Sequence, residues 1–314
     1  DRKGWDKKWK ATLSAPILSN QFSRQAITFT NPLPLPTPLE SKLKAYPSGY
    51  QPPGTDIAFR YLQSFVEKRA ENYSRHISKP LESRTSCARI SPHLAWGNLS
   101  NRQAWQYLRE AKSTSPHRRG IQGAITRLQW RDHFIQKFEN ECQMAKRHLN
   151  KGYDDFPFIE NEEQLQTWKE GETGVPLVDA CMRCLKATGW INFRMRAMLV
   201  SFLTHHLLMD WRKASSHLAQ LFLDYEPGIH YPQLQMQAGT TGYNTIRIYN
   251  PVKQQEEHDP EKIFIQQWLG ENYNLQPIID VQEQIKIHRK LAWSWRDRPA
   301  VKSDLSRILK RHVR

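Results

Sequence analysis

The residues of this sequence with the most chemical potential are arginines and tryptophans in one apolar stretch. Trp190, Arg194 and Arg196 lie close together, and Trp130 and Arg131 are neighbours earlier in the chain. Arg194 and Arg196 are two positions apart, so in a helix they point to different faces. An arginine buried in an apolar helix is costly unless an anion pairs with it. We therefore expect one arginine to meet a buried cofactor or carboxylate and the other an external phosphate, with a surface ion pair as the alternative.

Cysteine and histidine pairs are weaker candidates for chemistry. Cys181 and Cys184 form a C-x-x-C pattern inside a helical pattern, and the sequence has no second close cysteine pair, so core packing explains them better than zinc. His205 and His206 are adjacent, and in a helix they point about 100° apart, which prevents both from serving one metal. We expect no metal site. The usual dinucleotide and P-loop fingerprints are absent from the sequence.

The charge of the chain indicates a polyanionic partner. Its 314 residues carry 46 lysines and arginines against 31 acidic residues, a formal net charge of +15. Nucleic acid is the leading partner, because the 11 tryptophans can stack on bases while arginines hold phosphates. A basic surface over core tryptophans is the alternative. The apolar runs are too short for a membrane span, and four cysteines suit a reducing compartment, so we expect a cytoplasmic or nucleoid-associated protein with no membrane partner.

The elements that position these residues have helical patterns. Ile57, Tyr61 and Phe65 recur at intervals of four, and Ser100 with Gln103 is typical of a capping box. Long apolar periods without alternating strands predict an all-α, multi-helical fold. The predicted helices cover residues 55–76, the stretch that follows Ser100, 121–149, 176–189, 192–211, a further stretch to about 224, 260–269 and 280–295.

Two stretches lack a helical period. Residues 1–53 include the proline run "NPLPLPTPLE" and read as an irregular segment and linker ahead of a helical domain at 54–314. Residues 225–251 contain glycines and prolines throughout, which predicts a functional loop without helix. The chain begins at Asp1 rather than at a methionine, so we expect a fragment of a longer protein.

Four collinear stretches resemble the cryptochrome and DNA photolyase family. "GETGVPLVDACMRCLKATGWINFRMRAMLVSFLTHHLLMDWR" is similar to the family's G-x-T-G-x-P-x-V-D-A-x-M-R-x-L-x-x-T-G-W segment and arginine helix, and "TTGYNTIRIYNPVKQQEEHDPEKIFIQQWL" resembles its R-I-F-N-P ending. "ARISPHLAWGNLS" and "LQWRDHF" add to a resemblance over residues 54–275. It implies a helical, FAD-binding catalytic domain whose N-terminal α/β antenna domain is absent from this chain.

The resemblance also implies which residues contact FAD. His230 falls at a variable position facing flavin N5, where an imidazole would control protonation or serve only the structure. Cys87 and Ala88 replace the usual Thr-Ser, Phe193 replaces an Asn or His, and His206 replaces an Asp that commonly pairs with the arginine at Arg196. The implied cofactor residues are Tyr73, Arg89, Ile90 and Ser91 by the phosphates, with Arg131, Phe193, Arg196, His206, Asp224, Glu226 and His230.

For DNA, the resemblance gives a mixed expectation. Trp130 and Trp190 match two aromatic walls of the lesion pocket and, with His230, form the implied catalytic set. Arg194 matches a phosphate-contacting position. Against repair, Arg127 replaces a glutamate that binds the dimer, Ala197 a pocket methionine and Met236 a stacking tryptophan. The implied DNA-binding residues are Arg127, Trp130, Trp190, Arg194 and Met236.

Three functions follow, of which the first is preferred. It is a DNA photolyase, a carbon–carbon lyase that binds UV-damaged DNA, single strands included, and repairs pyrimidine lesions by light-driven electron transfer. The second is a blue-light photoreceptor of the cryptochrome type, and the third is a flavin-free nucleic-acid-binding module. A monomer is expected. The family's tryptophan chain to the flavin is broken here, because Trp211 matches its middle member but Leu234 stands next to the flavin.

Overall fold

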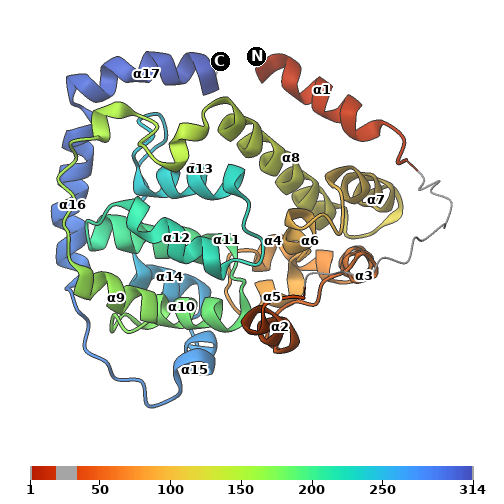
Figure 1. Cartoon of the computed structure of the whole chain (residues 1–314), viewed down its shortest axis with the longest axis horizontal. Coiled ribbons are helices and arrows are strands. Elements are labelled where there is room, and N and C mark those ends of the chain that lie inside the picture. Colours follow the sequence, from red (N-terminus) through yellow and green to blue (C-terminus); the bar gives the residue numbers. More distant parts are fainter. Residues whose placement is uncertain (1, 19–33, 313–314) are drawn as a thin grey trace.

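The computed structural model describes residues 2–18 and 34–312, and these form helices without any strand, which confirms the all-α class (Figure 1). In the first half the helices are α1 (Arg2–Ser14), α2 (Thr37–Lys44), α3 (Thr55–Glu67), η1 (Arg69–Glu71), α4 (Tyr73–His76), α5 (Ser83–Ser86), α6 (Ser91–Ala95), α7 (Asn101–Thr114), α8 (Arg118–Asn140), η2 (Cys142–Ala145) and η3 (Lys151–Tyr153). In the second half they are α9 (Glu162–Glu170), α10 (Pro176–Thr188), α11 (Phe193–Ser201), η4 (Phe202–His206), α12 (Trp211–Leu221), α13 (Pro227–Ala238), α14 (Pro251–His258), α15 (Ile263–Leu269), α16 (Val281–Arg296) and α17 (Pro299–His312).

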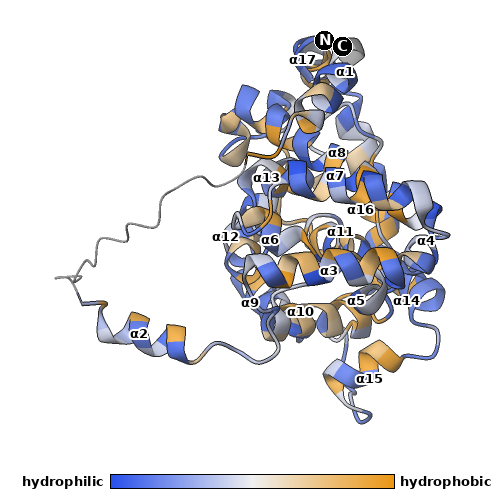
Figure 2. Ribbon diagram, turned by 90° about the vertical axis from the view of Figure 1, so that its right-hand side faces the viewer, coloured by the Kyte–Doolittle hydropathy of each residue, from blue (hydrophilic) through white to orange (hydrophobic). Residues whose placement is uncertain are grey.

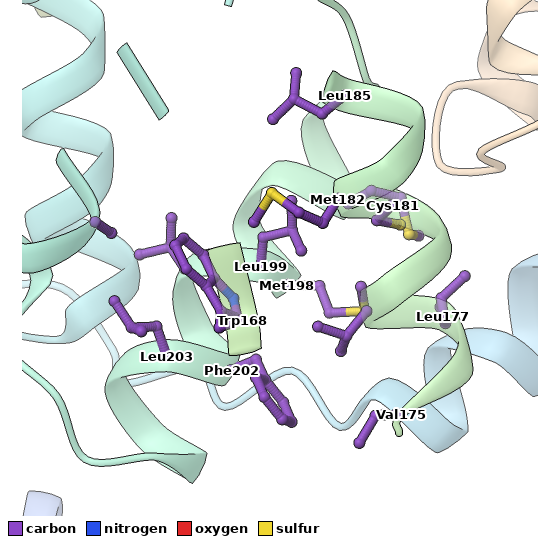
Figure 3. Close-up of a cluster of buried hydrophobic side chains, with 14 of the residues drawn as sticks. Trp168, Val175, Leu177, Cys181, Met182, Leu185, Met198, Leu199, Phe202 and Leu203 are labelled. Atoms are coloured by element: carbon purple, nitrogen blue, oxygen red, sulfur yellow. The ribbon is translucent and has the colours of Figure 1, made fainter. Parts of the chain in front are cut away.

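Two large hydrophobic cores meet at a single turn of the chain. The N-terminal core gathers buried side chains of α1, α3, α7 and α8 around Trp190. The C-terminal core gathers α9 to α13 with α15 and α16, and Figure 3 shows Trp168, Met182 and Phe202 within it. Trp190 belongs to the first core and Ile191 to the second. The turn between α10 and α11 therefore lies at the junction of the cores.

That turn is specified locally by its sequence. Pro176 occupies the start of α10, where its missing N–H costs nothing, and Gly189 ends the helix in a left-handed conformation, at φ +64°. A Cβ on Gly189 would lie 2.4 Å from Cγ of Leu223, so only glycine lets residues 222–224 approach. Asn192 then caps α11 by accepting a hydrogen bond from Met195 N. The predicted α10, including both ends, is confirmed.

α13 corrects the prediction of a loop without helix at residues 225–251. The helix starts because Glu226 accepts a hydrogen bond from Gly228 N and Pro227 takes the first position, and it ends at Gly239 in a left-handed conformation. Pro232 lies inside it, where the period-breaking residues suggested coil. Gly228 brings this end close to α8, since a Cβ there would lie 2.8 Å from Cα of Ile135. Residues 239–250 have no helix, as predicted.

Three further boundaries differ from the predictions. The helix predicted at 121–149 ends at Asn140 and is followed by short 3₁₀ turns. The helix predicted at 192–211 changes at Phe202 into a π-helical turn, η4. The N-terminal segment contains α1, whose Trp9 and Leu13 pack into the N-terminal core, and α2, which has no buried residue and lies to one side of the body (Figure 2). Among the described residues, no helix has the length and apolarity needed to cross a membrane.

Candidate functional site

The turn before α6 presents a buried, unneutralised cation. Arg89 has a left-handed backbone, at φ +57°, and its guanidinium lies 3.9 Å from the centre of the Trp190 ring. It donates to Arg84 O and to Gln51 Oε1, while its Nε has no partner among the residues that the structure describes. Burial, and secondarily the nearby Arg84, lowers the pKa of Arg89 to about 10. Within the described part of the chain Arg89 makes no ion pair, so the donors at this turn fit an added anion.

The other residues implied at the phosphates surround this turn. Tyr73 and Ile90 are buried, and Ser91 begins α6 two positions after Arg89. Burial raises the pKa of Tyr73 to about 12, and the nearby Arg127 opposes this rise. Burial also raises the pKa of the Cys87 thiol to about 12, so it is uncharged at neutral pH. The turn therefore adds no negative charge beside Arg89.

A bidentate ion pair lies near Arg89 and the turn before α6. Arg196 of α11 donates to both carboxylate oxygens of Asp224, at 2.9 and 3.0 Å, and its Nε donates to Ile191 O. Its guanidinium lies 4.2 Å from the centre of the Phe222 ring. Asp224 is near enough to Arg89 to influence its charge. One carboxylate thus connects the two arginines of the site, as the close approach at Gly189 allows.

His230 completes this group as a neutral imidazole. Its Nε2 is 2.9 Å from Ser215 O, and because a carbonyl only accepts, Nε2 carries the hydrogen and Nδ1 keeps a lone pair. Burial lowers the pKa of His230 to about 4. The hydrogen bond to the Ser215 carbonyl opposes this shift, the nearby Arg196 adds to it, and Asp224 opposes it. The rings of Tyr225 and Tyr231 pack edge-on against it. At neutral pH it can therefore accept a hydrogen bond but carries no charge.

A second ion pair connects α8 with the start of α13, next to this group of residues. Arg131 lies 3.4 Å from Glu226, the residue that caps α13, and donates to Leu94 O at the end of α6. Neighbouring Trp130 projects outward with 48% of its surface exposed, and Phe193 at the start of α11 is 51% exposed. Trp190 differs from both, since it is only 5% exposed beneath Arg89. The structure therefore does not pair Trp190 with Trp130 as a second open aromatic wall.

His206 lies away from Arg196. Its ring stacks on Phe202 at 5.2 Å, Nδ1 is 3.3 Å from Ser201 O, and Nε2 is buried with no partner in the described part of the chain. Burial lowers the pKa of His206 to about 3, so it is neutral. The partner of Arg196 is Asp224 instead, because η4 turns His206 into the C-terminal core.

Arg194 opens into a cavity on the other face of α11. The cavity has a volume of about 510 Å³, and five of its lining residues are cationic against one carboxylate, that of Glu257. None of the five makes an ion pair within residues 2–18 and 34–312, and Arg194 Nε is buried without a partner. This separation of Arg194 from Arg196 agrees with the predicted opposite faces. The cationic cavity, as we call it, is lined by Arg194, Arg247, Lys253, Lys286 and Arg289, with the carboxylate of Glu257, Gln254 and other uncharged residues.

Sequence reasoning missed four of those cations. Arg247 stands directly before "IYNP", and Lys286 and Arg289 are three apart on α16, so they share a helix face. That spacing was the available signal, but nothing local indicates that α16 packs near α11. The structure therefore groups Arg194 with partners that lie far away in sequence.

Two further residues that the sequence singled out lie elsewhere. Met236 of α13 is half-buried, and Ala197 is buried within α11.

Comparison with known proteins gives the family. Residues 124–295, more than half of the chain, match the family described as the FAD binding domain of DNA photolyase. The chain is 34% identical to a deoxyribodipyrimidine photo-lyase of Thermus thermophilus, over 76% of this chain and 57% of that protein, and 30% identical to one of Escherichia coli, over 86% and 55%. It thus spans little more than half the length of these relatives.

Solved structures share the fold. A bacterial class III photolyase from Agrobacterium tumefaciens superposes with a TM-score of 0.72 at 22% identity, covering 86% of this chain and 60% of that one. A Synechocystis cryptochrome superposes with a TM-score of 0.69 at 23% identity, covering 76% of this chain and 56% of that one. These likenesses concern the helical architecture, and the match to the family is carried by residues 124–295. The chain therefore belongs to the cryptochrome and DNA photolyase family, through its FAD-binding domain.

Proposed function

We propose that this protein is an FAD-dependent enzyme that binds UV-damaged DNA and repairs pyrimidine lesions under blue light. The observation that carries the proposal is the division of α11. Arg196 faces an internal ion pair beside a buried, unneutralised arginine, while Arg194 faces an open cavity with four other cations. A buried anionic cofactor fits the first setting and a polyanion outside the protein fits the second. The photolyase names of the relatives support the same activity.

The residues of the site fit FAD. Arg89, with its unpartnered Nε, would bind the phosphates together with Ser91 and Tyr73, and the thiol of Cys87 would not repel them. Arg196, oriented by Asp224, and His230, with a free lone pair at Nδ1, would contact the remainder of the cofactor. FAD supplies the light-driven electron chemistry when bound. The protein residues hold it, keep the imidazole neutral and exclude water by burial.

DNA would bind through charge, with its bases on exposed aromatic side chains. The cationic cavity would hold backbone phosphates, and Trp130, which is half exposed, would stack on an extruded base. The chain's formal charge of +15 attracts DNA from a distance. No base-reading motif is needed, since a lesion is recognised by the ease with which it leaves the stack.

A repair assay tests the proposal. Purified protein with chemically reduced flavin is mixed with a single strand that contains one cyclobutane dimer, and the dimer is quantified in blue light and in the dark. We expect loss of the dimer in light only. Trp130→Ala should slow repair, whereas Trp293→Ala, an exposed tryptophan of α16 outside the site, should not. Absence of light-dependent loss with both cyclobutane and 6-4 lesions would refute the repair function.

A photoreceptor is the second function that an observation favours. Arg127, at the position where the resemblance places a lesion-binding glutamate, is a cation close enough to the Tyr73 phenol to lower its pKa. A cation there cannot accept a hydrogen bond from a thymine as a carboxylate does. A protein that changes flavin redox state in light, binds DNA and leaves both lesions intact would be a receptor. Arg127→Glu would then be the variant that gains repair.

A further inference from the structure

Gln51 is a buried side chain in a segment whose composition is typical of a linker. It precedes α3 in the turn-rich stretch "PSGYQPPG", yet only 6% of its surface is exposed. Its Oε1 accepts a hydrogen bond from Arg89 Nη2 at 3.2 Å, and its Nε2 donates to Arg89 O at 2.6 Å. One carboxamide thus holds both the guanidinium and the backbone carbonyl of Arg89.

The surrounding contacts fix the position of this carboxamide. Its Nε2 also donates to His93 Nε2 at 3.0 Å, and His93 Nδ1 lies 3.3 Å from Asn98 Oδ1. Asn98 Oδ1 in turn accepts from Gly54 N, and the Tyr46 hydroxyl donates to Gln51 O at 2.7 Å. Gln51 therefore ties the segment of residues 46–54 to the turn before α6, and Gly54 ties its end to Asn98, which follows α6.

Gly49 allows the same segment to pack closely against α10. A Cβ at this glycine would lie 2.7 Å from Ala187 O, so the backbone approaches the helix as closely as it can. Ala187 belongs to the last turn of α10, directly before the junction of the two cores. Residues 46–54 consequently contact both the α10 side and the α6 side of the candidate site.

The chemistry of a glutamine suits a site that must stay cationic. Arg89 is held in a left-handed backbone conformation, which is strained for any residue with a Cβ and needs a fixed environment. A carboxylate would fix the guanidinium more strongly, but it would also neutralise the charge that an incoming phosphate requires. A neutral amide fixes the side chain and leaves that charge available.

We propose that Gln51 is a positioning residue of the cofactor site, which orders Arg89 for the phosphates of FAD without neutralising it. The inference rests on the proposed role of Arg89 as a phosphate ligand. With this role for Gln51, residues 46–54 form part of the cofactor site, because they pack against the turn before α6. The chemical class recognised is a dinucleotide pyrophosphate, and Gln51 acts on it only through Arg89.

The test compares FAD affinity among variants of the full chain after the flavin has been removed. Gln51→Ala should weaken FAD binding about tenfold, and Gln51→Glu should weaken it more, although glutamate is closer to glutamine in shape. Because glutamate also loses the hydrogen bond to Arg89 O, a purely structural role predicts that FAD affinity falls only in variants whose flavin-free form is also less stable to heat. Gln235→Ala is the matched control, because Gln235 is equally buried and bridges backbone atoms of residues 144–149 instead. Thermal unfolding of each flavin-free variant shows which of them fold, and Gln51→Met, which also removes the carboxamide, replaces Gln51→Ala if that variant does not fold.

The outcomes separate the inference from the assignment beneath it. If Arg89→Ala binds FAD like the unchanged chain, Arg89 is no phosphate ligand, and the inference fails with that assignment. If Arg89→Ala loses affinity while Gln51→Glu keeps it, the inference alone is wrong. Equal losses in Gln51→Ala and Gln235→Ala would also overturn it, since a general loss of packing would then explain both.

Discussion

Burial lowers the pKa values of two residues in the candidate cofactor site, Arg89 and His230. Arg89 keeps its proton at neutral pH although its pKa falls to about 10, whereas His230, with a pKa of about 4, stays neutral. The sequence indicated that His230 was ionisable but not that its environment prevents ionisation, because desolvation depends on packing from other elements. The site therefore presents a cation for phosphates beside an uncharged imidazole.

His206 provides a residue-scale prediction about stability. Its pKa is about 3 in the folded protein and about 6.5 in an unfolded chain, so between these pH values the unfolded chain binds the proton. The free energy of unfolding should therefore fall as the pH falls from about 6.5 toward 3, by up to about 1.4 kcal/mol per pH unit from this residue. His206→Phe removes the titration. Urea unfolding at pH 7 and pH 5 should show a weaker pH dependence in the variant.

Burial also lowers the pKa values of His205 and His230 to about 4, so the free energy of unfolding of His206→Phe should still depend on pH to some extent. The difference between the two proteins isolates the contribution of His206. Identical pH dependence in both would mean that His206 is protonated or solvated in the folded protein, contrary to its buried position.

At the scale of elements, α10 could be predicted from its sequence and α13 could not. Pro176 and Gly189 are local signals that act at the ends of α10. α13 contains Pro232 and is stabilised by packing on α8, where Gly228 permits a close approach, so tertiary contacts override the local pattern. Gln51 escaped prediction for the same reason, since its function depends on a contact with Arg89, which lies far along the chain. Local signals specify ends of helices, while packing specifies which residues meet.

The helices α12 and α13 carry a prediction about electron supply to the flavin. Trp211 is fully buried and donates to His148 Nδ1, and the resemblance places Leu234 rather than an oxidisable ring next to the flavin. Tyr225 and Tyr231 instead lie against His230, with their hydroxyls 3.3 Å apart. Trp211→Phe should therefore leave flavin photoreduction nearly unchanged. It should lower stability by about 1–3 kcal/mol, through lost packing and the lost hydrogen bond.

Transient absorption after a blue flash measures the route. Any photoreduction should depend on the tyrosines, and Tyr225→Phe or Tyr231→Phe should slow it. A tryptophan radical that forms promptly in the unchanged protein and disappears in Trp211→Phe would contradict this account.

At the scale of the whole molecule, the cationic cavity joins segments that are distant in sequence. Arg194 comes from α11, Arg247 and Lys253 from the stretch around the start of α14, and Lys286 and Arg289 from α16. Composition predicted a polyanionic partner, and family position predicted Arg194, but the face where the charges gather depends on how α16 folds back. The excess charge is therefore informative about the class of partner and uninformative about its place.

The cavity predicts DNA binding that is mainly electrostatic. Affinity for a single strand should fall steeply with salt, because phosphate contacts release counterions. Arg194→Ala should lower the slope of log affinity against log salt by roughly one ion. Lys302→Ala is the control, since Lys302 is exposed on α17 and already paired with Asp297 at 3.1 Å. Fluorescence anisotropy over a salt series gives both slopes, and an unchanged slope in Arg194→Ala would place the DNA elsewhere.

The central claim is that α11 separates an internal cofactor site from an external DNA site. The most direct measurement is the flavin absorbance per protein of Arg196→Ala and Arg194→Ala, purified in parallel. Arg196→Ala removes the partner of the buried Asp224 and should purify with little or no flavin, whereas Arg194→Ala should remain yellow. Full flavin occupancy in Arg196→Ala, or equal loss in both variants, would contradict the account.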